Sequence, residues 1–200
     1  MTSDSSATTG TLEAAALGTA NDNKFLSFCL GSEEYGVEIL RVREIIGIID
    51  ITPLPQTPDY VKGVVNLRGK IIPVIELRAK FGMPPVEYNE ETCIIVVEVT
   101  DERGEDQFQI GVVVDTVREV MDVPRDKIEP APRFGCALNT EYILGMGKTK
   151  DKVIILLDID RVLTVEEIGG LTVAAEASQH LANELEAAGN SEPGEHQEAA

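Results

Sequence analysis

One phrase occurs twice in this sequence, and that repeat restricts the fold more than any other feature. Residues 35–45 read YGVEILRVREI and residues 110–120 read IGVVVDTVREV, so a similar order of apolar, glycine and charged residues returns 75 positions later. A second correspondence, shifted by 82 positions, relates TPDYVKG at residues 57–63 to NTEYILG at residues 139–145. Such a duplication is typical of a chain that builds one small unit twice.

Both copies show the alternation of apolar and polar residues that is typical of β-strands. In FLSFCL, for example, Leu26, Phe28 and Leu30 fall on one face of an extended chain. After the turn sequence GSEE, a second alternating segment begins at Tyr35. Each half contains about five such strands in roughly 65–75 residues, which is typical of a small β-barrel. The sequence therefore predicts an all-β fold of two five-stranded β-barrels with short helical turns.

Proline and glycine carry local predictions in the first half. Residues 58–63 are expected to form one helical turn, because threonine followed by proline suits the start of a helix. Pro73 lacks the N–H that a strand ladder needs, which predicts an edge strand or a bulge at this residue. Gly82 is expected to end a short helix in RAKFG, and Arg68 with Gly69 to form a turn between two strands.

The repeat and the composition divide the chain into three parts. Residues 24–168 form the folded body, with a first barrel at about 24–88 and a second at about 89–168. Exchange of strands between these two barrels is an open alternative. Residues 1–23 are expected to be a flexible arm, and residues 169–200 an alanine-rich marginal helix followed by a disordered acidic tail.

The charge balance excludes two classes of partner. The chain has 35 acidic and 17 basic residues, a formal net charge of -18. An acidic body repels phosphate, so neither nucleic acid nor direct membrane insertion is expected. The amino-terminal segment lacks the features of a signal peptide, and no apolar run approaches the ~18 residues of a membrane span. Together with three cysteines at irregular spacing, these features predict a cytoplasmic protein.

Residues that could carry catalysis are scarce in the folded body. Both histidines, His180 and His196, lie outside it, which removes the commonest general base and metal ligand. The segment GMGKT lacks the earlier glycine of a phosphate-binding loop and is expected to be a hairpin turn. Asp158 and Asp160 could suggest a cation site, but an aspartate that caps a short helix is the commoner cause. We therefore expect no enzyme activity, no metal and no cofactor.

Four apolar residues lie where the strand alternation breaks. Val42 and Ile45 occupy this place in the first copy, and Val117 and Val120 occupy it in the second. They either fill the barrel cores or form a surface for a protein partner. Arg68, beside a turn glycine, is likewise either a solvated turn residue or a binding residue.

Four longer segments resemble the CheW family of bacterial chemotaxis coupling proteins: FLSFCLGSEEYGVEILRVREI, TPDYVKGVVNLRGKIIPVIELRAKF, GVVVDTVREVMDVPRDKIEPAPRFG and LNTEYILGMGKTKDKVIILLDIDRVL. The resemblance runs from about Lys24 to Glu167, and NLRG followed by PVIEL is its most specific part. It implies two SH3-like barrels around a shared hydrophobic interface, acting as a scaffold without catalysis. It also implies coupling of methyl-accepting chemoreceptors to the histidine kinase CheA at receptor arrays on the inner face of the cytoplasmic membrane, with other CheW copies as further partners.

The resemblance implies two sets of binding residues. The receptor-facing set comprises Ile39, Val42, Glu44, Ile45, Arg68 and Val120. The kinase-facing set comprises Glu129, Arg133 and Phe134, in and beside the segment IEPAPRF. Glu129 precedes Pro-Ala-Pro and Arg133 follows it, which reverses the charges of the familiar form of the family. These pairings therefore require a kinase surface whose charges are reversed as well.

Three other functions remain open at this point. A CheW-domain scaffold could serve a chemosensory pathway that does not control motility. A small barrel that binds nucleic acid would need a basic face with exposed aromatic residues, and the chain has only four tyrosines and five phenylalanines. A hydrolase that uses an unrecognised pair of carboxylates is the third.

Overall fold

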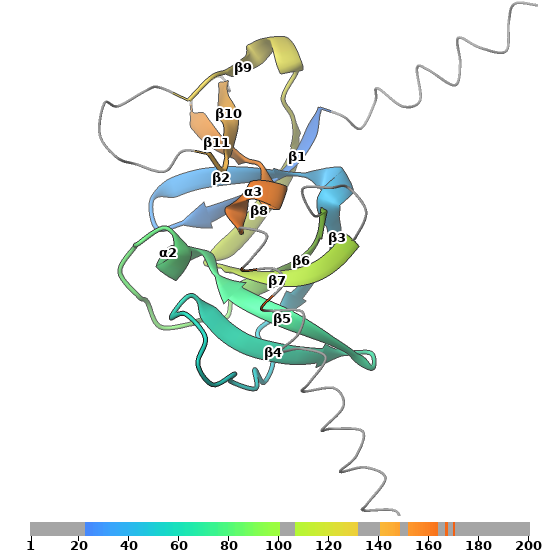
Figure 1. The fold of residues 1–200 in the computed structure, drawn as a ribbon. Helices are drawn as coiled ribbons and strands as arrows, with labels where there is room; N and C mark the ends of the chain where they lie inside the picture. Colours follow the sequence, from blue (N-terminus) through green and yellow to red (C-terminus); the bar gives the residue numbers. More distant parts are fainter. Residues whose placement is uncertain are drawn as a thin grey trace, which may run out of the picture.

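The computed structural model describes residues 23–100, 107–131, 141–148 and 152–163, together with Glu167 and Gly170. The described strands form two curved sheets, joined by short helical turns (Figure 1). One sheet has six strands, in the order β8 (Thr116–Asp122), β1 (Lys24–Leu30), β2 (Glu33–Glu38), β11 (Val153–Leu157), β10 (Ile143–Lys148) and β9 (Ile128–Glu129). The other has five, in the order β3 (Val42–Gly47), β6 (Cys93–Thr100), β7 (Gln107–Val114), β5 (Lys70–Glu76) and β4 (Val61–Leu67). The helical turns are η1 (Ile39–Arg41), α2 (Leu77–Lys80), η2 (Arg125–Lys127) and α3 (Ile159–Val162).

Each sheet contains strands from both halves of the chain. β1 and β2 of the first half join β8, β9, β10 and β11, whereas β6 and β7 of the second half join β3, β4 and β5. Each sheet joins the two halves twice: once by an antiparallel pairing, β1 with β8 or β3 with β6, and once by a parallel pairing, β2 with β11 or β5 with β7. The predicted all-β fold of two SH3-like barrels is confirmed, with a sixth strand of two residues in one sheet. The boundary between the two duplicated units near residue 88 stays a prediction. Each sheet contains strands from both units.

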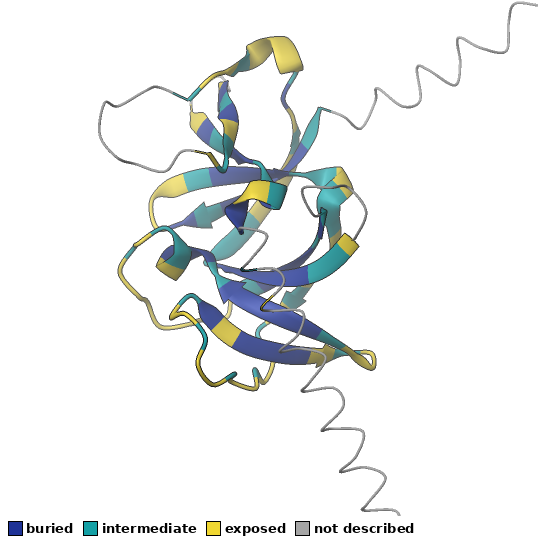
Figure 2. Cartoon of the chain, in the orientation of Figure 1, coloured by how far each residue is buried: buried dark blue, intermediate teal, exposed yellow. Residues whose placement is uncertain are grey.

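Among the described residues, the buried apolar side chains form three clusters, which explain the uninterrupted apolar runs of the sequence. One cluster belongs to the β3–β7 sheet alone and includes Ile94 and Val96, and another belongs to the other sheet and includes Phe25. The largest cluster, which we call the shared core, contains residues of both sheets. Ile95 and Val97 of β6 belong to this cluster. Alternate residues of β6 therefore face a barrel interior and the contact between barrels, and the strand is buried on both faces (Figure 2).

Two glycines that correspond in the repeat, Gly36 and Gly111, lie in the parallel pairings. A Cβ added to Gly36 would lie 2.9 Å from Cδ2 of Leu156, and one added to Gly111 would lie 2.8 Å from Cγ2 of Ile94. Carbon atoms in normal contact are about 3.5–4.0 Å apart. Core side chains thus cover the backbone at both joints, and only glycine fits there without a shift of its neighbours.

The helical turn predicted at residues 58–63 is shorter than expected and ends at Val61. The N–H of Val61 donates to the carbonyl of Pro58 at 2.8 Å, which closes a single turn, and β4 begins at Val61. The carbonyl of Tyr60 accepts the N–H of Glu76 at 2.7 Å. Pairing with β5 therefore uses the backbone groups that a longer helical turn would have needed.

The prediction of an edge strand or a bulge at Pro73 is wrong. β5 lies between β4 and β7, and the irregularity in its pairing with β4 falls between Val61 and Gly63 of the partner strand. The pairing of β5 with β7 begins at Val74, so the missing N–H of Pro73 removes no bond from it. The short helix of RAKFG is confirmed as α2, and Gly82 after it has a φ of 69°.

Candidate protein-binding surface

Two sheet edges, β3 and β8, carry the residues that the sequence singled out as breaks in the alternation. Ile45 of β3 pairs with Ile95, and Val120 of β8 pairs with Leu26. Residues that face each other across antiparallel strands project from the same side of a sheet, and Ile95 and Leu26 both belong to the shared core. Ile45 and Val120 extend this core to the solvent, where they are 44% and 50% exposed.

Three further residues continue this apolar surface. Ile39, Val42 and Val117 are partly buried and pack against the shared core. The two edges are close together, because Cys93 pairs with Gly47 at the end of β3 and its thiol contacts the backbone of Val117 in β8. We call the exposed and half-buried residues of the two edges the edge surface: Ile39, Val42, Ile45, Val117 and Val120.

Glu44 and Arg68 do not belong to the edge surface. The register of β3 shifts between Val42 and Glu44, so that Glu44 pairs with Val96, whose side chain lies inside the barrel. Nη2 of Arg68 donates to Oε2 of Glu44 at 2.9 Å. The predicted receptor-facing set is thus divided between its apolar members on the edge surface and an ion pair on the opposite face of β3.

Arg68 lies in a tight turn that constrains its own backbone. Its φ is 54° and that of Gly69 is 84°, which is typical of a type I′ hairpin turn. The side chain of Asn66 accepts the N–H of Gly69 at 2.9 Å. The left-handed conformation is therefore shared between Arg68 and Gly69, whereas the Arg68 side chain is 80% exposed.

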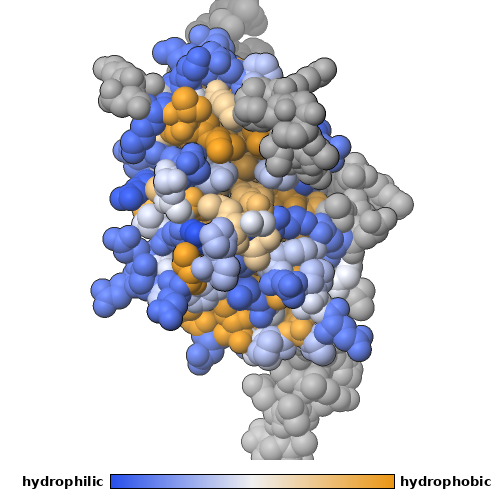
Figure 3. All heavy atoms as spheres, turned by 90° about the vertical axis from the view of Figure 1, so that its left-hand side faces the viewer, coloured by the Kyte–Doolittle hydropathy of each residue, from blue (hydrophilic) through white to orange (hydrophobic). Residues whose placement is uncertain are grey.

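A second exposed surface lies on the sheet formed by β9, β10 and β11. Leu144 of β10 and Val153 of β11 are exposed on it. Apolar residues also gather in patches on the face of the molecule shown in Figure 3. Glu129, the described member of the predicted kinase-facing set, pairs with Met146, and its carboxylate accepts a bond from Nζ of Lys148 at 2.7 Å. Arg133 and Phe134 lie outside the described residues. Sequence reasoning missed Leu144 and Val153, since an exposed residue within an apolar strand leaves no mark in the pattern.

The acidic residues that the sequence offered as a cation site are used in ion pairs. Asp158 forms an ion pair with Arg161, whose Nε lies 3.1 Å from Oδ2, and Asp160 pairs with Arg41. Asp158 makes no side-chain bond that caps α3, so the helix-cap explanation is wrong for this residue. The described ranges hold no group of three or more His, Cys, Asp or Glu residues that could hold a metal ion.

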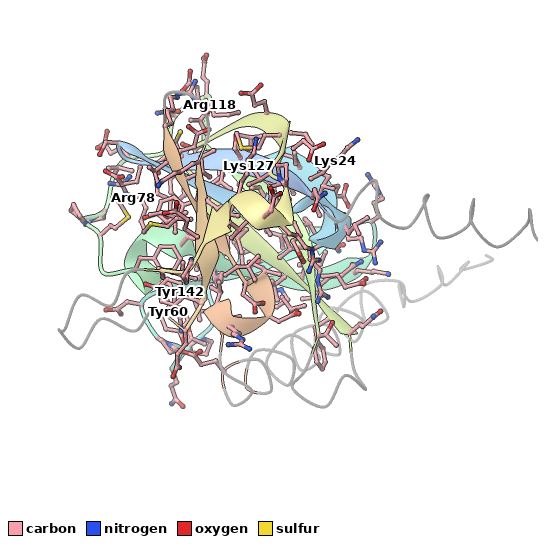
Figure 4. All side chains as sticks on the ribbon, turned by 90° about the horizontal axis from the view of Figure 1, so that it is seen from above. Lys24, Tyr60, Arg78, Arg118, Lys127 and Tyr142 are labelled. Atoms are coloured by element: carbon pink, nitrogen blue, oxygen red, sulfur yellow. The ribbon has the colours of Figure 1, made fainter. Side chains whose placement is uncertain are left out.

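Burial and neighbouring carboxylates raise the pKa of several titratable groups. Burial, together with a bond that its hydroxyl donates to Glu167, raises the pKa of Tyr60, and Nζ of Lys80 lies 4.3 Å from the centre of the same ring. Tyr142, which corresponds to Tyr60 in the repeat, lies on the same side of the molecule (Figure 4). Burial also raises the pKa of the Cys93 thiol, which therefore stays protonated at neutral pH and is a poor nucleophile.

These features define a class of protein. Two similar barrels share one core, and apolar strand edges reach the surface where the barrels meet. Groups with a raised pKa, such as Tyr60, Cys93 and Tyr142, pack against that core. That combination is typical of a scaffold that binds other proteins. None of the helices in the described ranges has both the length and the apolar character needed to cross a bilayer.

Known proteins place the chain within a family of such scaffolds. The CheW-like domain family matches residues 24–167. Chemotaxis protein CheW of Klebsiella aerogenes is 44% identical over 72% of this chain and 84% of its own length, and that of Helicobacter pylori is 36% identical over 76% and 90%. The crystal structure of the scaffolding protein TtCheW from Thermoanaerobacter tengcongensis superposes with a TM-score of 0.64 at 36% identity, over 73% of this chain and 95% of that one.

The chain therefore belongs to the CheW family. These similarities support the function of a chemotaxis coupling adaptor and do not favour nucleic-acid binding.

Proposed function

We propose that this protein couples methyl-accepting chemoreceptors to the histidine kinase CheA and thereby brings the kinase under receptor control. The edge surface carries this proposal, because it exposes Ile45 and Val120 where two barrels meet. A strip of apolar residues of this kind suits one face of an amphipathic helix. The helical hairpin tip of a receptor would supply that face.

The ion pair of Arg68 and Glu44 supplies a polar contact for the same partner. The Arg68 side chain is 80% exposed, and its bond to Glu44 uses one of the five N–H donors of the guanidinium. A planar fork of donors suits a carboxylate or the carbonyl groups at the end of a helix. Because Glu44 and Ile45 lie on opposite faces of β3, we expect the receptor to contact both faces of this edge strand.

The sheet of β9, β10 and β11 is our candidate for the kinase contact. Leu144 and Val153 give it exposed apolar area, and Glu129 with Lys148 gives it an exposed ion pair at the rim. Arg133 and Phe134 complete the proposed contact with the regulatory domain of CheA. Other CheW copies could use the same surface, because the resemblance implies that this kinase domain is itself CheW-like.

In this role the protein acts as a scaffold, without catalysis or a cofactor. We place it in the cytoplasm, recruited to receptor arrays at the inner face of the cytoplasmic membrane through its partners. The net charge of -18 supports contacts with proteins rather than with nucleic acid or anionic lipid.

Two valines provide a matched test of the two surfaces. Val120 and Val153 both lie in strands and are 50% and 52% exposed. Val120→Glu should weaken binding to a soluble cytoplasmic receptor fragment by about tenfold or more, because a carboxylate would be desolvated in an apolar contact. It should leave binding to the CheA regulatory domain unchanged, and Val153→Glu should have the opposite effects. If each variant weakened both contacts equally, the assignment of two separate surfaces would be wrong.

A further inference from the structure

Arg41 ends η1, the turn that leads directly into the edge strand β3. Its Nη2 donates to Oδ2 of Asp160 in α3, and its Nη1 donates to Oγ1 of Thr100 at 2.9 Å. Oδ1 of the same aspartate accepts the N–H of Thr100 at 2.7 Å. Three groups thus bond to one another in a closed ring that ties α3 and the end of β6 to the start of β3.

A second ion pair stands at the start of the other edge strand. Asp115 directly precedes β8, and its Oδ2 accepts a bond from Nη1 of Arg78 in α2 at 2.5 Å. The same oxygen accepts the N–H of Gly31 at 2.6 Å. Nε of Arg78 donates to the carbonyl of Pro84 at 3.1 Å, and this arginine is buried. Figure 4 shows Arg78 on the same side of the molecule as Tyr60 and Tyr142.

The two ion pairs are related by the repeat, with their charges exchanged. The shift of 82 positions that relates the halves matches Arg78 of α2 with Asp160 of α3. Asp115 lies one position before Thr116, the residue that matches Arg41 under the shift of 75. In each case the short helix of one half bonds to the residue before the edge strand of the other half.

The reversed charges also discriminate between the two pairings. Opposite charges meet in the observed arrangement, whereas exchanging the helices would bring Arg78 toward Arg41 and Asp160 toward Asp115. Like charges in contact are repulsive. The apolar patterns of the two halves are similar and would allow either short helix to contact either edge strand. The charges of these residues therefore favour the observed contacts, α2 with β8 and α3 with β3.

We propose that Arg41 with Asp160, and Arg78 with Asp115, are positioning residues that hold the starts of β3 and β8 and so fix the geometry of the edge surface. Val42 of the edge surface directly follows Arg41, and Val117 lies two positions after Asp115. Arg41 and Asp160 are partly exposed, with side-chain exposures of 30% and 24%, whereas Arg78 is buried. The first pair therefore adjusts the edge surface with less effect on folding. The consequence for receptor binding rests on the proposed function.

Asp160→Asn tests the first pair, because it removes the charge and keeps the shape of the side chain. Glu98→Gln is the matched control, since Glu98 pairs with Arg43 of the same edge strand but does not connect it to α3. In the full-length protein, Asp160→Asn should speed amide hydrogen exchange in residues 42–47 by tenfold or more and leave residues 143–148 unchanged. It should weaken binding to the soluble receptor fragment by about tenfold and leave binding to the CheA regulatory domain unchanged. Glu98→Gln should alter none of these quantities by more than about twofold.

A double mutant separates positioning from general stability. If Arg41 and Asp160 act as one unit, Arg41→Gln combined with Asp160→Asn should lose no more than either change alone. Faster exchange throughout both sheets, with equal losses for both partners, would show that Asp160 only stabilises the fold and would overturn the proposal. Unchanged exchange in residues 42–47 would overturn it as well. If the unaltered protein failed to bind the receptor fragment, the proposed function would fail, while the exchange of β3 would still decide the positioning role.

Discussion

At the scale of single residues, Arg68 bridges the two edges of its sheet. Its turn connects β4 with β5, and β4 is one edge of the five-stranded sheet, whereas Glu44 belongs to β3 at the other edge. An ion pair with an 80% exposed arginine contributes only about 0–1 kcal/mol, because water screens it. The side chain is thus better suited to recognition than to holding the barrel closed.

Arg68→Glu should therefore abolish receptor coupling with little effect on stability. Loss of a bond to a charged group typically costs ~1.5–3 kcal/mol, which is roughly ten- to a hundred-fold in affinity for the receptor fragment. Arg68→Lys should be intermediate, since it keeps the charge and loses the planar fork. Affinity and melting temperature measured on the same samples check this. A melting temperature lowered by several degrees together with lost binding would make Arg68 a structural residue.

The reversed pair, Arg68→Glu with Glu44→Arg, is the control for this prediction. The double variant restores an ion pair between the sheet edges. A partner would now meet the negative charge at position 68 and the positive charge at position 44. Receptor binding should stay weak in the double variant. Recovery of binding would assign the effect to the ion pair itself and not to a contact between Arg68 and the receptor.

At the scale of elements, the strands could be predicted and their partners could not. Alternation revealed β1 and β2, and apolar runs revealed β6 and β11, because such patterns are local. In the parallel pairing of β2 with β11, Gly36 lies opposite Leu156. A local pattern cannot predict a contact between residues so far apart in the sequence. The face of β3 from which Glu44 projects could not be predicted either, because the register shift in β3 depends on its pairing with β6. The sequence and its family resemblance identified the candidate residues. Only the strand pairing shows that Glu44 and Ile45 lie on opposite faces of β3.

Gly111→Ala tests the account of the parallel joints. Its Cβ would lie 2.8 Å from Ile94 Cγ2 and 3.2 Å from Val74 Cγ2, and both are branched core side chains with little room to move. Overpacking of this kind typically lowers the free energy of unfolding by ~1–3 kcal/mol. Gly47→Ala is the control, because an added Cβ there meets no atom within 4 Å. Urea unfolding of both variants measures the difference, and equal stabilities would show that the joint tolerates a side chain.

At the scale of the whole molecule, the exchange of strands makes the two barrels interdependent. β1 and β2 cannot complete a sheet without β11, and β5 cannot without β7. The shared core adds residues from both sheets to one apolar cluster. We therefore expect the pair of barrels, rather than either duplicated unit, to be the unit of stability.

We accordingly expect the full-length protein to unfold in one cooperative step. Far-UV circular dichroism and tyrosine fluorescence should give the same midpoint in urea, as two-state unfolding requires. Tyr35 and Tyr60 provide probes in β2 and beside β4, strands of different sheets. Two separate transitions would mean that each barrel is stable by itself, which would contradict an interdependent fold.

If this protein couples receptor and kinase as proposed, kinase activity should respond to receptor ligand only through it. The most direct measurement is the autophosphorylation rate of CheA in membranes that contain the cognate receptor, with and without the protein, before and after receptor ligand is added. We predict that the rate responds to the ligand only when the protein is present, and that Val120→Glu and Val153→Glu each remove the response. A ligand response that persists without the protein, or that survives both substitutions, would contradict the account.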